Sequence, residues 1–91
     1  MDSWRNLIET FVSGKIDAPT FELAFLDLHR SEVNRGESIR YAVDLLFYEV
    51  DAYCADPRLR RTEDLDDEGL LVAARKALDD WELPWPPIPV R

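Results

Sequence analysis

The stretch Ile16-Asp17-Ala18-Pro19-Thr20-Phe21 predicts the start of an amphipathic helix. Asp17 can accept a hydrogen bond from a backbone amide of the first turn, and Pro19 occupies a first-turn position whose amide needs no partner. Ile16 and Phe21 stand at the N′ and N4 positions of a hydrophobic staple. The helix that follows has one apolar face, formed by Phe21, Ala24, Phe25 and Leu28.

The same arrangement recurs downstream, in Leu65-Asp66-Asp67-Glu68-Gly69-Leu70. Asp66 is placed to cap a helix, and Leu65 and Leu70 are placed to form its staple. The two acidic residues after the cap favour the positive end of the helix dipole. The apolar face of this helix is formed by Leu70, Leu71, Ala74, Ala77, Leu78 and Trp81.

Two more amphipathic stretches complete the set. One begins at Trp4 and ends at Ser13-Gly14, because glycine accepts the left-handed conformation that closes many helices. The other follows a polar loop over residues 31–36 and runs from about Ser38 to Cys54, before Asp56-Pro57, where proline disfavours a helix. Their apolar faces are formed by Trp4, Leu7, Ile8, Phe11 and Val12 in the first, and by Ile39, Ala42, Val43, Leu46, Val50 and Tyr53 in the second.

These four helices predict an all-α fold, an antiparallel up-down four-helix bundle over residues 1–82. No segment of useful length alternates apolar and polar residues as a strand does, and the short connections favour antiparallel neighbours. Residues 83–91 form a Pro-rich tail that favours polyproline II. Its Pro84–Pro87 and Pro86–Pro89 pairs match a minimal PxxP ligand, but with Trp85 between them we expect the tail to pack back along its own bundle.

The composition argues against several classes of function. The chain has 91 residues with 19 acidic and 11 basic side chains, giving a formal charge of −8. This balance argues against direct binding of nucleic acid, which needs a Lys/Arg surface. No apolar run is long enough to span a membrane, and the first residues do not have the pattern of a signal peptide. We expect a cytoplasmic protein, monomeric or weakly dimeric when free.

The single Cys54 and single His29 leave little room for catalysis. One cysteine cannot form an intrachain disulfide, and a zinc site needs about four ligands of these types. We expect Cys54 to be a core or boundary thiol and His29 a surface imidazole. The acids at 64–69 resemble part of a calcium loop, but the twelfth position, which should be a bidentate Glu, is Arg75. The sequence therefore predicts a protein that is not an enzyme and uses no metal or cofactor.

Acidic residues concentrate between positions 44 and 68, where nine acids stand against three arginines. At about 100° per residue, Tyr41, Asp44, Tyr48 and Asp51 fall on the helix face opposite the buried one. Tyrosines beside carboxylates suit a protein interface, in which tyrosines supply contact area and carboxylates supply steering. A solvated helix face beside a capped helix start is the alternative explanation.

Three stretches together resemble the colicin D immunity protein family, the self-protective colicin-like immunity proteins. They are residues 11–17 leading into Phe21-Glu22, then residues 44–53, and last residues 65–70 with Ala74-Arg75 and Leu78. The likeness covers roughly residues 7–82. It implies a small antiparallel four-helix bundle that binds and inactivates a cognate bacterial toxin, typically a tRNA-cleaving nuclease domain.

The resemblance implies that an acidic surface covers the toxin's basic substrate cleft. The candidate toxin-binding residues are Asp44, Tyr48, Asp51, Asp56, Glu63, Asp64, Asp66 and Asp67. Two features depart from the family pattern, namely the positive charge of Arg58, Arg60 and Arg61 in the loop and the Pro-rich tail. The alternative function is a non-enzymatic adaptor or scaffold subunit that binds another protein, or itself, through the same Tyr/Asp face.

Overall fold

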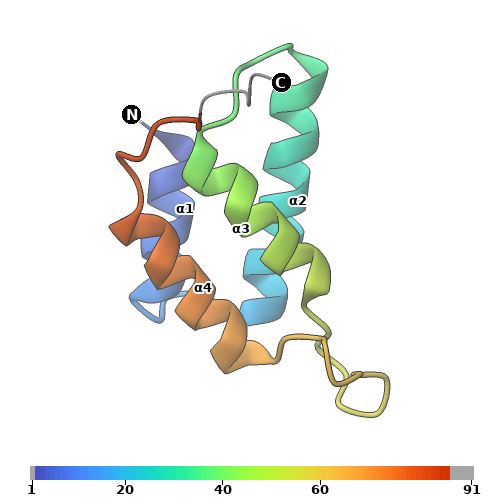
Figure 1. Cartoon of the computed structure of the whole chain (residues 1–91). Coiled ribbons are helices and arrows are strands. Elements are labelled where there is room, and N and C mark those ends of the chain that lie inside the picture. Colours follow the sequence, from blue (N-terminus) through green and yellow to red (C-terminus); the bar gives the residue numbers. More distant parts are fainter. Residues whose placement is uncertain (1, 87–91) are drawn as a thin grey trace, which may run out of the picture.

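Four α-helices make up the chain in the computed structural model, which describes residues 2–86. The helices are α1 (Ser3–Val12), α2 (Ala18–Asn34), α3 (Tyr41–Ala52) and α4 (Asp67–Asp79). Helix α1 packs against both α2 and α4, and α3 packs mainly against α4 (Figure 1). This part of the chain contains no strand beyond a single isolated bridge, so the predicted all-α four-helix bundle is confirmed.

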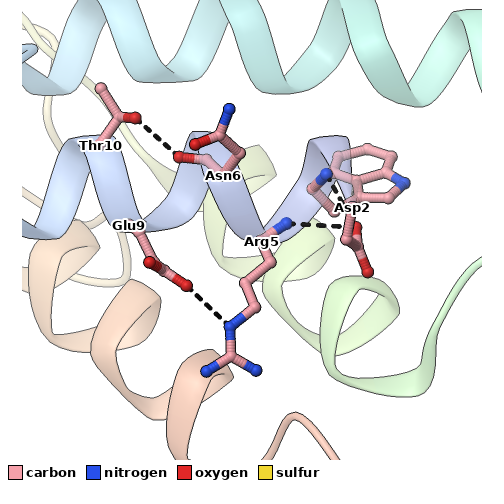
Figure 2. A network of polar contacts seen from close by, with 6 residues as sticks. Asp2, Arg5, Asn6, Glu9 and Thr10 are labelled. Atoms are coloured by element: carbon pink, nitrogen blue, oxygen red, sulfur yellow. Dashed lines mark hydrogen bonds and ion pairs between the residues drawn. The ribbon is translucent and has the colours of Figure 1, made fainter.

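Local contacts fix the outer side of α1 (Figure 2). Asp2 caps the helix, because its Oδ1 accepts hydrogen bonds from the backbone amides of Trp4 at 3.0 Å and Arg5 at 3.3 Å. One turn on, Arg5 Nε donates to Glu9 Oε1 at 2.7 Å. The opposite side of α1 enters the core through Trp4, Ile8 and Phe11.

The predicted caps of α2 and α4 are confirmed. Asp17 Oδ1 accepts from the amide of Thr20 at 2.9 Å, and Asp66 Oδ1 accepts from the amide of Gly69 at 2.8 Å. The hydrogen bonds with Thr20 hold the pKa of Asp17 below its usual value, because they favour the charged carboxylate. Both aspartates therefore stabilise the first turn of their own helices.

Helices α1 and α2 end alike, in a glycine with positive φ. Gly14 has φ of 83° and Gly36 has φ of 73°, and the amides of each glycine and of the next residue bond back to carbonyls of the last helical turn. Gly14 confirms the predicted end of α1. The predicted loop over residues 31–36 is wrong in part, because α2 continues to Asn34 and only its closing turn reaches Gly36.

Helix α3 begins at Tyr41, three residues later than the predicted Ser38. Arg40, the residue before it, is extended, and both Ile39 and Arg40 make long-range contacts. The guanidinium of Arg40 lies 4.7 Å from the ring centroid of Trp81 and donates to the Trp81 carbonyl at 2.8 Å. The carbonyl of Ile39 accepts from Trp85 Nε1 at 3.0 Å. These partners lie about 40 residues away in the sequence, so the spacing of apolar residues within the helix does not reveal them.

Helix α3 also ends earlier than predicted, at Ala52 instead of Cys54. Tyr53 forms a parallel bridge with Leu65, in which Cys54 N donates to the Leu65 carbonyl and Leu65 N donates to the Ala52 carbonyl, at 3.0 and 2.9 Å. The bridge closes the loop between them and sets the start of α4 beside the end of α3. The two helices therefore run antiparallel as neighbours (Figure 1).

The core combines aromatic and aliphatic side chains, and the rings of Phe11 and Phe21 stack at 4.4 Å. Tyr53 and Trp81, both predicted inside, are 5% and 4% exposed. The prediction of a surface imidazole is wrong, because His29 is half-buried and stacks on Phe47 of α3 at 4.3 Å. This pair forms a side-chain contact between α2 and α3.

The described part of the tail lies against the bundle. Besides its bond to Ile39, the Trp85 side chain places its ring 5.1 Å from that of Tyr41. Residues 87–91, and with them the second partner of each predicted PxxP pair, lie outside the described residues. None of the helices in residues 2–86 is long and apolar enough to cross a membrane.

Candidate functional site

The outer face of α3 places only part of the predicted Tyr/Asp set in solvent. Tyr48 is 63% exposed and Asp51 is also exposed, whereas Asp44 is half-buried. Tyr41, the fourth member, is half-buried beside the ring of Trp85, so the tail covers part of it. The accessible part of this face is therefore centred on Tyr48, with Asp44 and Asp51 on the side that turns toward Phe47.

Three of the candidate acids make no hydrogen bond or ion pair with their side chains among the described residues. Among the hydrogen bonds and ion pairs found within residues 2–86, none involves the side chain of Asp44, Asp51 or Glu63. Such carboxylates are available to pair with basic groups of a partner. Changing Asp51 or Glu63 also costs little folding free energy, since surface substitutions away from structural contacts usually have small effects. Asp44 lies in the first turn of α3, where its charge favours the helix dipole by a few tenths to about 1 kcal/mol.

Two other candidates are used inside the loop between α3 and α4. Asp56 accepts from the amide of Arg58 at 2.9 Å and pairs with its guanidinium at 3.1 Å, and this partner holds the pKa of Asp56 below its usual value. Asp64 Oδ2 accepts from the amide of Arg61 at 2.9 Å. Arg60 Nε donates to the Cys54 carbonyl at 3.1 Å. Of the three arginines that depart from the family pattern, Arg58 is thus paired with a carboxylate inside the loop, and Arg60 is bonded to a backbone carbonyl.

The last two candidates belong to the start of α4. Asp66 is its N-cap, and Asp67 Oδ1 accepts a 2.6 Å hydrogen bond from the hydroxyl of buried Tyr53. Burial, and then the bond to Asp67, raise the pKa of the Tyr53 hydroxyl well above its usual value. Asp66 therefore stabilises the start of α4 and Asp67 ties that start to the end of α3, whatever they contribute to a partner.

A groove between α3 and α4 lies next to Tyr48 and was missed by the sequence reasoning. It measures about 750 Å³, and its middle is lined by Leu45, Tyr48, Val72 and Ala73. Leu45 is 38% exposed and Val72 is 56% exposed. The available signal was that both residues are apolar yet lie off the predicted core faces of their helices.

Acidic side chains border this groove. Its lining includes Glu49 of α3 together with Asp66 and Glu68 at the start of α4. Near the other end Lys76 forms an ion pair with Asp80 at 2.6 Å. The region thus offers apolar contact area, one exposed tyrosine and negative charge, which is the chemistry of a protein-binding surface.

Comparison with known proteins gives a match to one family, and this match spans the whole bundle. The family model described as bacterial self-protective colicin-like immunity matches residues 2–81. A search of curated proteins gave no match. The matched range contains all four helices, the groove and every candidate acid.

Proposed function

Because the chain belongs to the family of bacterial self-protective colicin-like immunity proteins, we propose that it neutralises a cognate nuclease toxin by covering the toxin's basic substrate cleft. The family is one of non-catalytic inhibitors, so binding is the activity to explain. The proposed toxin cleaves tRNA, and the complex forms in the cytoplasm of the cell that is protected. The acidic surface then occupies the place that RNA phosphates would take.

The observation that carries this proposal is the uncommitted charge on the outer face of α3. Asp44 and Asp51 flank an exposed Tyr48, and no ion pair within residues 2–86 neutralises either carboxylate. A nuclease cleft carries the opposite charge because it binds phosphates. Complementary charges raise the rate of encounter, and a central tyrosine supplies buried contact area once the surfaces meet.

The test measures binding and protection with a candidate toxin domain, sought first among the products of neighbouring genes. Wild type is expected to inhibit cleavage of a tRNA pool by that domain, with an association rate that falls between 50 and 300 mM salt. Asp51→Lys is expected to weaken binding by at least tenfold, because reversing one interfacial charge removes an attraction and adds a repulsion. Asp44→Lys should act in the same direction.

Asp27→Lys is the matched control. Asp27 is an exposed acid in the middle of α2, and its side chain has no partner among the contacts within residues 2–86. Glu9 is less suitable, since it pairs with Arg5. Control and test variants should melt like wild type, and the control should bind within twofold. Salt-insensitive association, with full protection by Asp51→Lys and Asp44→Lys, would reject the acidic-surface mechanism and favour an adaptor that uses another face.

A further inference from the structure

The α3/α4 groove, defined by Leu45, Tyr48, Val72 and Ala73, is an apolar recess on the outside of the bundle. Its middle presents two aliphatic side chains that reach water from two different helices, Leu45 at 38% and Val72 at 56% exposure. Scattered exposed apolar residues are common and need no explanation. Two that face the same recess beside an exposed tyrosine form a place where one apolar side chain of a partner can be buried.

The charge around the groove is uneven. Glu49 and Glu68 are both exposed and stand at the end nearest the α3–α4 loop, where Asp66 also lines the groove. None of the ion pairs within residues 2–86 involves either glutamate. At the opposite end the charge of Lys76 is matched by Asp80. The groove is therefore apolar in the middle, negative at one end and neutral at the other.

From this pattern we infer that the α3/α4 groove receives a basic amphipathic segment of the toxin. One apolar side chain enters between Leu45 and Val72, and a lysine or arginine beside it on the same segment meets Glu49 and Glu68. The inference rests on the proposed function and adds a second contact to it, on the other side of Tyr48 from Asp44 and Asp51. The apolar contact supplies burial, which surface charge alone does not.

Two other occupants fit less well. A second copy of this chain carries a formal charge of −8 and would bring one acidic rim against another. The described part of the chain's own tail, up to Pro86, is engaged elsewhere, because Trp85 is bonded to Ile39 and lies against Tyr41. A basic partner removes the repulsion and supplies the missing countercharge.

The first experiment measures the affinity of that candidate toxin domain for Val72→Gln and Val33→Gln. Val33 is the matched control, because it is 54% exposed, lies on α2 and is not part of the groove lining. Glutamine leaves the charge unchanged and suits a helix at least as well as valine. Val72→Gln is expected to weaken binding about tenfold through lost burial, and Val33→Gln less than twofold. Equal binding by wild type and Val72→Gln would overturn the inference while leaving the proposed function intact.

The second experiment does not depend on the toxin. A 14-residue helical peptide with leucine and tryptophan on one face and lysine on the other is titrated into labelled protein and followed by amide NMR shifts. Shifts at Leu45, Tyr48 and Val72 are expected, reduced by Val72→Gln and absent with a peptide whose lysines are replaced by glutamate. Equal shifts with the glutamate peptide, or lysine-peptide shifts confined to Asp44 and Asp51, would overturn the inference. Failure of wild type to bind the toxin would reject the proposed function. The peptide titration would still show whether the groove binds a basic amphipathic segment.

Discussion

Replacing Trp81 with alanine is expected to destabilise the bundle more than any other change proposed for this protein. Trp81 is 4% exposed, lies just after α4 and belongs to the hydrophobic core. The guanidinium of Arg40 lies 4.7 Å from its ring centroid and that of Arg5 lies 5.8 Å away, both within the range of cation–π attraction. The Trp81 carbonyl also accepts the hydrogen bond from Arg40 that holds the start of α3.

The size of the effect follows from burial. A buried tryptophan removes about 200 Å² from water, which at about 25 cal/mol per Å² corresponds to about 5 kcal/mol as an upper bound. Measured tryptophan-to-alanine changes in cores cost about 3–5 kcal/mol, in agreement with that figure. A domain of this length is stable by about 5–14 kcal/mol, so the variant loses a large share of its stability.

The assay is thermal and denaturant unfolding followed by far-UV circular dichroism. Trp85→Ala is the control, because Trp85 is the same residue type but 54% exposed, and its loss should cost about 1 kcal/mol. Trp81→Phe, which keeps an aromatic ring, should unfold between the two and provides a measurable variant if alanine prevents folding. A Trp81→Ala melting temperature within 2 °C of wild type, with lost toxin binding, would refute the core assignment and place Trp81 in the interface.

Three further changes test contacts described above. Tyr53→Phe should cost about 1–1.5 kcal/mol in unfolding free energy, because it removes the bond to Asp67. The raised pKa of Tyr53 means that its stabilisation is complete below about pH 10 and is lost as pH rises further, so the variant should show a weaker alkaline loss in pH-dependent melts. Asp66→Ala should cost about 1 kcal/mol, whereas Asp66→Asn, which still caps, should cost only a few tenths; equal losses in denaturant melts would contradict the cap. Gly36→Ala should destabilise by about 1 kcal/mol because φ there is 73°, and an unchanged melting temperature would contradict that strain.

The local parts of the fold were predictable from the sequence. The caps at Asp17 and Asp66 and the end of α1 at Gly14 depend on residues within one helical turn of each other, and all three were predicted correctly. The boundaries of α3 were not, because they depend on contacts between distant segments. Arg40 meets Trp81, and Tyr53 pairs with Leu65, so neither end of α3 follows its own periodicity.

Which of the candidate residues are exposed and which have partners was predictable only in part. Sequence showed where the acids concentrate, and Tyr48 with Asp51 is exposed as expected. It did not show which carboxylates already have partners, since those bonds depend on how the loop folds. The α3/α4 groove was also not predicted, because Leu45 and Val72 belong to separate helices and line one groove only once those helices pack together.

Partner choice in this protein is therefore expected to reside in a small set of residues. Asp66 and Asp67 hold the start of α4 and cannot change freely without cost to folding. The outer side of α3 and the exposed wall of the groove carry no such constraint, because their side chains contribute little to the core. Substitutions around Tyr48 can thus alter the charge and shape offered to a toxin while the bundle stays folded. An immunity protein that must follow changes in its toxin gains from this separation, since specificity can change without loss of stability.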